Sequence, residues 1–488
     1  MKITRRSALK AAATGLILPL TESACTPRRP EARVLPSRIA LPRPFETELP
    51  IIPVLPVSIP DSVADYYDLT VRPARATIIP GTTTGIWGYN GIFPGPVIHA
   101  QRGRRVVLRL RNGLPVPSVN HLHGGHTPPE SDGYPLDFVL PGAVREYVYP
   151  NEQRSATLWY HEHRMDFTGA QVWRGLAGFY ILHDDEEKQL PLPAGHKEIA
   201  LAICDRSFDA DGSLQYPSLD ASLKNRPGVA HQYMGGVFGD VILVNGAPWP
   251  RLDVANVKYR LRFLNASNAR RYELAFEPAL PFIQIGGDGG LLAVPTAHRT
   301  LRIAPAERFD AIVDFARFAV GTEITLLNRA ATGPAGQVMR FHVTHAERDD
   351  TSIPAKLSDV APPDPAEAIL TRTFDFAFGR KTEIWTINGK PFDPNRMDAQ
   401  PRLNTTEIWR LRTDFSHPLH LHLVHFRVLS HSGRPGPWDA GYKDTIDLAP
   451  GEVANILVKF TGYRGRYVFH CHNLEHEDMA MMANFEVV

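Results

Sequence analysis

Short runs of alternating apolar and polar residues recur along the chain, and few stretches show the longer period of a helix. Residues 106–111 (VVLRLR) combine an apolar start with alternation, and residues 145–149 (REYVY) alternate throughout. Successive side chains of a strand point to opposite faces, so these runs predict partly buried strands. Turn pairs such as Asn112-Gly113 and Asp211-Gly212 separate them. The pattern predicts an all-β protein built from antiparallel sandwiches.

The chain has 488 residues, too many for one hydrophobic core, and about 150 residues per domain would give roughly three domains. A first sandwich is predicted over residues 66–188, which end in an acidic stretch, and a second over 196–348. A polar, proline-rich stretch follows, and a third sandwich is predicted over 368–488. Residues 26–65 are rich in proline and arginine, which predicts an extended lead-in.

Each predicted sandwich contains an Asn-Gly pair at a position where a tight turn is possible. The pairs are Asn90-Gly91, Asn245-Gly246 and Asn388-Gly389. Both residues of such a pair tolerate the left-handed backbone that tight hairpin turns require. The echo is compatible with duplicated modules, although no strict internal repeat is visible.

Composition adds limits on the partners of this protein. Hydrophobic residues make up 43% and charged residues 22%, as in ordinary soluble proteins. The formal net charge of +1 gives no strong attraction to nucleic acid or to an anionic membrane, so we expect no nucleic-acid partner. We expect a monomer. The 20 histidines are more informative, because most of them are clustered.

Residues 1–25 have the order of an export signal. Arg5-Arg6 lies in a twin-arginine pattern, and the apolar residues 11–20 that follow are too few to span a bilayer. We therefore expect export by the twin-arginine route to the periplasm or the cell exterior. Ser23-Ala24-Cys25 is similar to the end of a lipoprotein signal, but Glu22 departs from that pattern. Membrane attachment is expected only if Cys25 is lipidated.

The three cysteines provide no disulfide framework. Besides Cys25 they are Cys204 and Cys471, which are far apart in the sequence. Cys204 ends the apolar run 199–204, which predicts a buried small hydrophobic residue. Cys471 has a different setting, because it stands between two histidines.

Four clusters contain most of the chemically informative residues. They are His121-Leu122-His123, His161-Glu162-His163, the run His417-Pro418-Leu419-His420-Leu421-His422, and His470-Cys471-His472 with His476 and Met481. Side chains at i and i+2 of a strand share a face, so each His-x-His pair can present two imidazoles to one metal or to adjacent metals. In an extended His470-Cys471-His472 the thiolate would face one way and the two imidazoles the other. That arrangement would give a short covalent path between two metal sites.

Ligand type then favours particular metals. One thiolate, two histidines and a weak axial methionine are a blue-copper set, which Cys471, His417, His476 and Met481 supply. Imidazole alone also suits zinc, iron and nickel. Zinc is the main competitor, but it has no redox chemistry and would make no use of an adjacent thiolate–copper centre. The remaining histidines therefore favour copper throughout: His121, His123, His161, His163, His420, His422, His470 and His472.

Several motifs resemble those of the multicopper oxidases, the family of laccases, bilirubin oxidases and cuprous oxidases. The segments 84–96, 121–125 and 158–163 are similar to the signatures of that family. Residues 121–135, including Ser131-Asp132-Gly133-Tyr134-Pro135, are most similar to the branch of bacterial spore-coat laccases, bilirubin oxidase and phenoxazinone synthase. The resemblance covers nearly all of the chain after the signal. It implies three consecutive cupredoxin-like Greek-key β-sandwich domains and four copper ions.

The resemblance also implies a role for each candidate residue. His417, Cys471, His476 and Met481 would hold a type 1 copper. His121 and His420 would hold a type 2 copper, and a type 3 pair would be held by His123, His161, His163, His422, His470 and His472. Single electrons from a small reducing substrate would enter at the type 1 copper, and dioxygen would be reduced to water at the other three. Glu477 and Asp132 are similar to acids assigned to proton delivery, although each could instead be a hydrogen-bond partner of a ligand or a solvated acid.

The electron donor is the least determined feature. One hypothesis is oxidation of phenols, aminophenols or bilirubin-like pigments; the alternative is a cuprous or other metal oxidase used in copper detoxification. Cuprous oxidases often carry a methionine-rich segment, since thioethers suit Cu(I). This chain has only 8 methionines and no such insert before the last motif, which favours the organic substrate. The turn 433–436 is expected to line the approach of the substrate.

Overall fold

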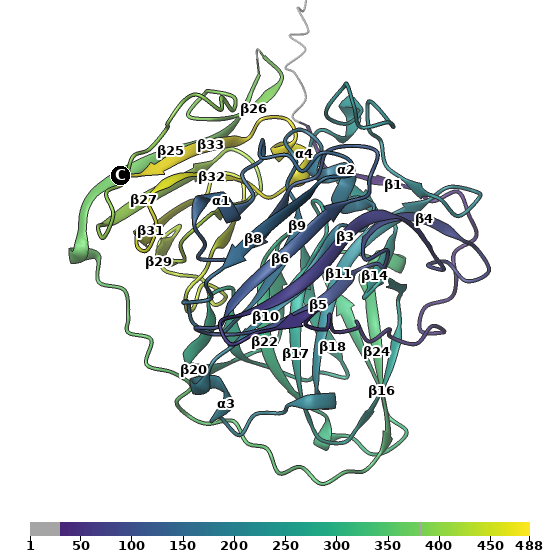
Figure 1. Ribbon diagram of the computed structural model, residues 1–488. Coiled ribbons are helices and arrows are strands. Elements are labelled where there is room, and N and C mark those ends of the chain that lie inside the picture. The colour runs from purple at the N-terminus through teal and green to yellow at the C-terminus, as the bar shows by residue number, and fades with distance from the viewer. Residues whose placement is uncertain (1–29, 381) are drawn as a thin grey trace, which may run out of the picture.

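The structure is a computed structural model that describes residues 30–380 and 382–488 (Figure 1). The twin-arginine segment and Cys25 lie outside the described residues. Strands dominate, and they form three pairs of packed sheets that follow one another along the chain. The predicted all-β class of cupredoxin-like sandwiches is confirmed. The boundaries given above for the three sandwiches stay a prediction.

The first sandwich has two sheets around one apolar core that includes Leu108, Tyr147 and Leu158. One sheet has the order β5 (Gly95–Gln101), β10 (Ala177–His183), β9 (Ala156–Glu162), β7 (Asn120–His123). The other has the order β2 (Ile59–Pro60), β3 (Ala64–Ala76), β6 (Arg105–Asn112), β8 (Val144–Tyr149), with β4 (Thr84–Tyr89) beside β3. Three short helices accompany them: α1 (Pro129–Asp132), α2 (Thr168–Trp173) and α3 (Asp185–Lys188).

The second sandwich contains the largest sheet. Its order is β15 (Ala247–Pro248), β14 (Val241–Val244), β11 (Glu198–Phe208), β17 (Lys258–Asn265), β22 (Arg308–Asp314), β19 (Phe282–Gly287), β20 (Gly290–His298), with β12 (Leu214–Gln215) beside β11. The facing sheet has the order β16 (Arg251–Ala255), β24 (Gln337–His345), β23 (Glu323–Asn328), β18 (Tyr272–Glu277), β21 (Leu301–Ile303). A small sheet joins the lead-in strand β1 (Arg33–Leu35) to β13 (Val237–Gly239). Four 3-10 turns accompany this region: η1 (Gly195–Lys197), η2 (His231–Tyr233), η3 (Phe315–Arg317) and η4 (Gly333–Gly336).

The third sandwich begins after the 3-10 turn η5 (Pro365–Glu367). One sheet has the order β26 (Ile384–Ile387), β25 (Ala368–Gly379), β27 (Thr406–Thr413), β31 (Val453–Lys459), β29 (Phe426–His431). The other has the order β30 (Thr445–Leu448), β28 (His417–Leu421), β32 (Gly465–Cys471), β33 (Met482–Val487), and the short helix α4 (Leu474–Glu477) follows β32. In Figure 1 this sandwich, green to yellow, lies beside the purple-to-blue first sandwich.

The sheets of the predicted antiparallel sandwiches are not antiparallel throughout. Each sandwich contains a parallel pair between an early strand and a later one: β3 with β6, β11 with β17, and β25 with β27. In a Greek-key sandwich the chain crosses from one sheet to the other and returns, which can bring two strands of the same direction together. The alternation within one strand says nothing about the direction of its neighbour, so the sequence pattern could not show this.

The three Asn-Gly pairs occupy equivalent turns in the three sandwiches. In every pair both residues have positive φ, from 51° at Asn245 to 85° at Gly246, as a tight hairpin turn requires. Each asparagine side chain accepts a 2.8 Å hydrogen bond from a backbone N–H of the first long strand of its sandwich, at Thr70, Ala202 and Asp375. The same contact in three places indicates that the sandwiches are copies of one module.

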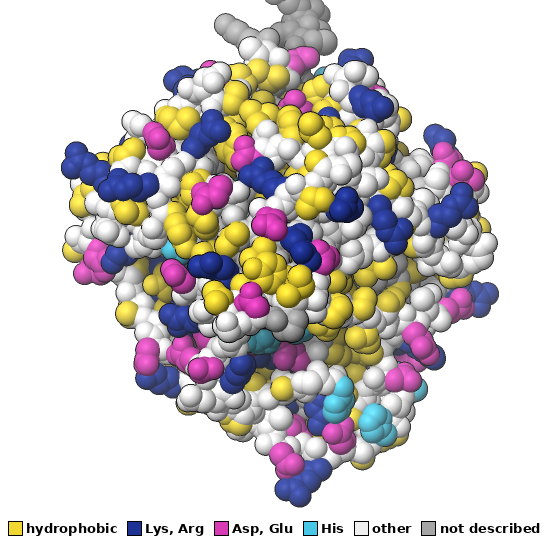
Figure 2. Space-filling model, in the orientation of Figure 1, with side chains coloured by type: hydrophobic (Ala, Val, Ile, Leu, Met, Phe, Trp, Pro, Cys, Tyr) yellow, Lys and Arg dark blue, Asp and Glu magenta, His cyan; other side chains and the backbone are white. Residues whose placement is uncertain are grey.

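The surface carries no field of a single sign on the face seen in Figure 2. Basic, acidic and apolar side chains are interspersed over it, in line with the formal net charge of +1. No helix among the described residues is long and apolar enough to cross a membrane.

Candidate metal centre

Four strands bring the histidine clusters to the interface between the first and third sandwiches. Strands β7 and β9 come from the first, and β28 and β32 from the third. Strand pairing places His121 opposite His161 and His420 opposite His470. The eight histidines of this histidine cluster are all fully or almost fully buried: His121, His123, His161, His163, His420, His422, His470 and His472.

The expected alternation of side chains is present on both strands of the third sandwich. Leu419 and Leu421 of β28 and Phe469 and Cys471 of β32 belong to the apolar core of that sandwich. The histidines between them face the opposite side, toward the first sandwich, where their rings contact those of its histidines. The strand geometry therefore separates the thiol of Cys471 from the neighbouring imidazoles, as its tripeptide sequence indicates.

Three imidazole nitrogens meet closely at one edge of the histidine cluster. The Nε2 atom of His470 lies 3.2 Å from Nε2 of His163 and 3.2 Å from Nε2 of His422. The Nδ1 atoms of the same rings lie against carboxylates: His422 is 2.8 Å from Asp132 Oδ2, while His163 and His470 are 3.4 and 3.2 Å from the two oxygens of Glu477. Nδ1 of His422 is hydrogen-bonded to Asp132, and Nδ1 of His470 donates to the backbone carbonyl of Cys471 at 3.1 Å, so the proton of each ring lies on Nδ1 and the Nε2 lone pairs point inward. Converging lone pairs repel unless a cation binds between them.

The other histidines of the cluster also direct an unpartnered nitrogen inward. In three of these rings Nδ1 donates to a backbone carbonyl. The carbonyl belongs to Asp132 for His121, to Glu162 for His161 and to Asp444 for His420, at 2.6, 2.8 and 2.9 Å. The Nε2 atoms of these three rings are buried and have no hydrogen-bond partner among the described residues. His123 is reversed, since its Nε2 contacts Asp444 Oδ1 at 3.0 Å and its Nδ1 is left free. Buried polar atoms are rarely unpaired, and metal ligation explains these.

A second centre, the thiol site, lies within the core of the third sandwich. Cys471 Sγ is 3.3 Å from Nδ1 of His417 and 3.6 Å from Nδ1 of His476, and these two nitrogens are 3.1 Å apart. The side chain of Met481 is fully buried in the same core, and its backbone carbonyl accepts the N–H of Cys471. One sulfur and two imidazole nitrogens within this distance fit a metal that accepts thiolate, two histidines and a thioether.

Burial sets the protonation of these groups. Burial lowers the pKa of histidines in both centres, to about 3 for His161 and to about 4 for His163. These two rings are therefore neutral at neutral pH and able to bind a metal. Burial raises the pKa of the Cys471 thiol, which means that the protein alone does not hold the thiolate. A bound cation would supply the positive charge that the thiolate needs.

The two acids expected in proton delivery lie against the histidine cluster, and both are 1% exposed. Neither is a solvated acid. Burial raises the pKa of Asp132 well above its usual value. Burial acts in the same direction on Glu477, but the neighbouring His163 and His470 outweigh it and leave the pKa of that carboxyl below its usual value. Asp132 is hydrogen-bonded to Nδ1 of His422, and Glu477 lies 3.4 and 3.2 Å from Nδ1 of His163 and His470, so both acids stand where they can affect candidate ligands.

Two functional contacts were not predicted from the sequence. Asp444 contacts both His123 and His420, and its carboxylate is paired with the guanidinium of Arg308, at 2.7 and 2.5 Å. The indole of Trp385 stacks on the ring of His476 with centroids 3.7 Å apart and planes at 25°. Neither Asp444 nor Trp385 stands in a His-x-His motif, so no spacing pointed to them.

A cavity of about 420 Å³ opens between the second and third sandwiches, close to the thiol site. It is called the Trp438 cavity after one of its walls. Ser416, the residue before His417, lines it, and so does Asp447, which pairs with Pro418 across the sheet. Gly436 from the turn 433–436 is a further lining residue.

Comparison with known proteins agrees with this geometry. Two family models described as multicopper oxidase match residues 70–187 and 362–488. A laccase of Bacillus subtilis (strain 168) is 39% identical over 491 aligned residues, which cover 86% of this chain and 94% of that protein. The bilirubin oxidase of Albifimbria verrucaria is 36% identical, over 90% of this chain and 81% of its own. A crystal structure of a laccase from Pediococcus acidilactici Pa5930 is similar with a TM-score of 0.83 and 30% identity, covering 93% of this chain and 96% of that one.

The fold, the thiol site and the histidine cluster together define a copper oxidase of stacked cupredoxin-like sandwiches. The chain belongs to the multicopper oxidase family. It is a laccase-like enzyme that uses copper, dioxygen and a reducing substrate.

Proposed function

We propose that the chain binds four copper ions and couples the one-electron oxidation of a phenolic, aminophenolic or bilirubin-like substrate to the reduction of dioxygen to water. A type 1 copper is assigned to the thiol site of His417, Cys471, His476 and Met481. Type 2 copper is assigned to His121, whose Nδ1 is hydrogen-bonded to the backbone carbonyl of Asp132, and to His420, whose Nδ1 is hydrogen-bonded to that of Asp444. The type 3 pair is assigned to the other six histidines of the cluster: His123, His161, His163, His422, His470 and His472.

The observation that carries this proposal is the alternation along β32. Cys471 faces the thiol site, while its direct neighbours His470 and His472 face the histidine cluster. The covalent path from Sγ to either imidazole therefore runs through a few bonds of one strand. Electron transfer between the site that accepts single electrons and the site that reduces dioxygen requires such a path.

Bound copper would supply the redox chemistry, and the side chains of the chain set its surroundings. The Nδ1 atoms of His417 and His476 and the Sγ of Cys471 would hold the type 1 ion away from water, since all three residues are buried. Asp132 is hydrogen-bonded to Nδ1 of His422, which orients the Nε2 lone pair of that ring inward, and the Glu477 carboxylate lies 3.4 and 3.2 Å from Nδ1 of His163 and His470. Because both acids are buried beside the cluster, we assign them the delivery of protons to the oxygen that is reduced there.

The Trp438 cavity is the proposed binding place of the reductant. It combines an aromatic wall with polar groups and lies one residue from the ligand His417. Its volume of about 420 Å³ suits a small aromatic molecule. The relatives named for laccase and bilirubin oxidase activities support organic substrates of this kind.

Oxidation of Cu(I) is the alternative. Met479 lies close to the thiol site and packs against its core, and a thioether there could receive a soft cation. The chain has only 8 methionines in total, however, and no methionine-rich insert, which favours the organic substrate.

The cellular setting is also a proposal. We infer export by the twin-arginine route to the periplasm or the cell exterior, as a monomer, with membrane attachment only if Cys25 is lipidated. Mass spectrometry of the mature protein tests this, since a chain that keeps residues 1–25 without modification contradicts export with cleavage.

Oxygen uptake decides between the two substrates. Equal amounts of copper-loaded enzyme are given an aminophenol, a dimethoxyphenol, bilirubin or Cu(I), with copper-free protein as the control. We expect uptake with at least one organic donor and none without copper. Uptake with Cu(I) alone would reject the laccase-like substrate and leave the cuprous oxidase.

A further inference from the structure

Two histidines outside the copper centres meet at the rim of the junction between the first and second sandwiches. His99 lies on β5 and His183 on β10, and the parallel pairing of these strands places His99 opposite Ile181. His183 follows Ile181 by two positions, so both histidine side chains are on the same face of the sheet. Nδ1 of His99 lies 2.9 Å from Nε2 of His183. These two residues, called the rim pair, therefore bring two ring nitrogens to one place.

A buried carboxylate fixes the tautomer of His183. Nδ1 of His183 contacts Oε2 of Glu187 at 3.2 Å, and the Glu187 side chain is only 4% exposed. Burial acts to raise the pKa of Glu187, but the guanidinium of Arg262 outweighs it and leaves that pKa below its usual value, so the carboxyl is ionised. An ionised carboxylate only accepts hydrogen bonds, so the proton of His183 is on Nδ1 and its Nε2 lone pair faces His99. Histidines that bind a metal are usually held by a carboxylate in this way.

We propose that the rim pair binds one exchangeable divalent transition-metal ion, Cu(II) in preference to the other divalent ions of the first row, at a site separate from the copper centres. Its protein ligands are Nδ1 of His99 and Nε2 of His183, and water fills the remaining positions. As the ion binds, the proton on Nδ1 of His99 moves to Nε2 of the same ring, so both rings stay neutral and no net proton is released. Two protein nitrogens hold an ion less firmly than the larger ligand sets of the copper centres, so this ion exchanges. The proposal does not depend on which reductant the enzyme oxidises.

The separation of the two nitrogens matches a coordination sphere. Imidazole nitrogens lie about 2.0–2.1 Å from a bound ion, so two of them at 90° around a square-planar ion are about 2.8–3.0 Å apart. Ring nitrogens in the thiol site and in the histidine cluster approach each other similarly, to 3.1 and 3.2 Å. A hydrogen bond from His99 to His183 spans the same distance when no ion is bound. Because His99 is exposed, a small rotation of its ring admits the ion without a movement of the strands.

The charges behind the rim pair favour a cation. The carboxylates of Glu187, Glu198 and Asp310 surround two guanidinium groups, those of Arg260 and Arg262, with contacts of 2.5 to 3.2 Å. Three carboxylates against two guanidinium groups leave one negative charge in this largely buried cluster. A positive ion on the rim pair balances that charge, and Glu187 is the contact between the cluster and the pair.

The rim pair is accessible through a cavity of about 380 Å³ between the first and second sandwiches. His99 of the first sandwich lines this cavity together with Glu198 of the second, which gives the ion an entry path. Strand β10 begins at Ala177, which pairs with His161 of the histidine cluster. The six residues from there to His183 extend roughly 20 Å along the strand. An ion at the rim pair is therefore outside the ligand sets of the copper centres.

The test measures exchangeable copper on the full-length protein with its resident metal ions. The wild type and the variants His99→Gln, His183→Gln and His342→Gln are desalted with a weak chelator, and their copper content and melting temperature are recorded to verify that the fold and the centres are intact. Each protein is then dialysed against a series of Cu(II) concentrations, and the additional copper per chain is measured. His342→Gln is the matched control, because His342 is also partly exposed and contacts a carboxylate, that of Asp253 at 3.5 Å, but lies on β24. Electron paramagnetic resonance difference spectra report the ligands of the added copper.

We expect the wild type and His342→Gln to take up one additional Cu(II) per chain with similar affinity, and the spectrum of that copper to show coupling to two nitrogens. His99→Gln and His183→Gln should each bind the ion about tenfold more weakly or worse, because each lacks one of its two protein ligands. Equal uptake by all four proteins would show adventitious binding elsewhere and overturn the assignment. No additional uptake by the wild type would overturn it too, since the rim pair would then be a hydrogen-bonded pair only. Absence of oxygen uptake with phenols would reject the proposed substrate and leave this result unaffected.

Discussion

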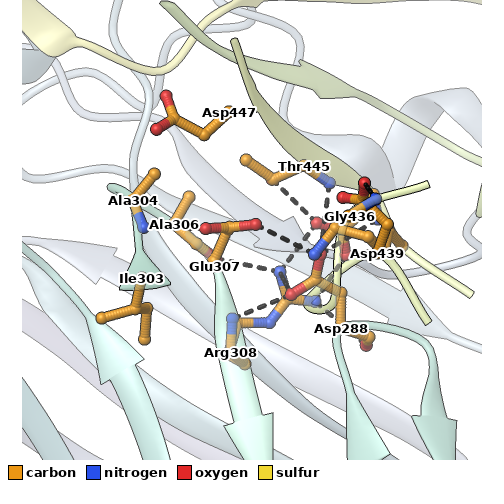
Figure 3. A network of polar contacts seen from close by, with 12 residues as sticks. Asp288, Ile303, Ala304, Ala306, Glu307, Arg308, Gly436, Asp439, Thr445 and Asp447 are labelled. Carbon is orange, nitrogen blue, oxygen red and sulfur yellow. Dashed lines mark hydrogen bonds and ion pairs between the residues drawn. The ribbon is translucent and has the colours of Figure 1, made fainter. Parts of the chain in front are cut away.

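Replacement of Arg308 by methionine should loosen the junction of all three sandwiches. The guanidinium is fully buried and donates a hydrogen bond from each of its nitrogens. It donates to both carboxylate oxygens of Asp444 in the third sandwich and to the carbonyl of Thr157 in the first, the latter at 2.9 Å. In the second sandwich it donates to the carbonyls of Ala306 and Asp288, at 3.0 and 3.1 Å (Figure 3). Arg308→Met removes these bonds and leaves the Asp444 carboxylate buried without its cation.

The magnitude follows from that orphaned charge. Removal of one partner from a buried ion pair costs about 3–5 kcal/mol. A loss of 1 kcal/mol lowers the melting temperature by about 2–4 °C in a unit of 150–250 residues, so the expected decrease is about 6–20 °C. Arg329→Met is the matched control, since Arg329 pairs with Glu277 at 3.1 Å but both side chains are more than half exposed. Such a surface pair contributes about 0–1 kcal/mol.

The assay is thermal unfolding of copper-free and copper-loaded protein at one scan rate. The double variant Arg308→Met with Asp444→Asn should recover part of the stability of the copper-free protein, because it removes the unpaired charge. A melting temperature of Arg308→Met within 2 °C of that of Arg329→Met would refute the reasoning. So would a double variant that is less stable than Arg308→Met alone.

Two further predictions concern the surroundings of the thiol site and the wall of the Trp438 cavity. Trp385→Ala should destabilise the protein by about 3–5 kcal/mol and shift the blue band, because a fully buried indole that stacks on His476 is lost. Trp385→Phe should keep most of the stability and leave the band near its wild-type wavelength. An unshifted band in Trp385→Ala would argue against any effect of the stack on the copper. Asp439 and Glu452 raise the pKa of His431 to about 9, above the value of about 6.5 expected in the unfolded chain. The contribution of these ion pairs to the stability should therefore be complete below about pH 6.5 and be lost as the pH rises through 9. His431→Gln should therefore lower the melting temperature most at pH 6 and hardly at pH 10, and an equal decrease at both values would show that the imidazolium is not the stabilising form.

The candidate ligands could be predicted from the sequence because strand geometry is local. A period of two fixes which side of a strand a residue faces, so the opposite directions of Cys471 and His470 follow from their adjacency alone. The same argument placed His420 and His422 on one face. Ligand chemistry then indicated copper without any knowledge of the fold.

The surroundings of those ligands could not be predicted, because they are assembled from distant segments. Arg308 reaches Asp444 across 136 positions, and Asp132 reaches His422 across 290. No spacing links either pair in the sequence. His99 and His183 likewise stand 84 positions apart, and only the pairing of β5 with β10 reveals that they share a face. Strand direction was missed for the same reason, since pairing between β3 and β6 is a tertiary feature.

The central claim is that Cys471 binds the copper that receives electrons from the substrate, and Cys471→Ser tests it most directly. Absorption, copper content and oxygen uptake are measured for the wild type and the variant. We predict a blue thiolate–copper band and about four coppers per chain in the wild type. In the variant we predict no blue band, one copper fewer and no oxygen uptake with any donor. An intact blue band in Cys471→Ser would contradict the account.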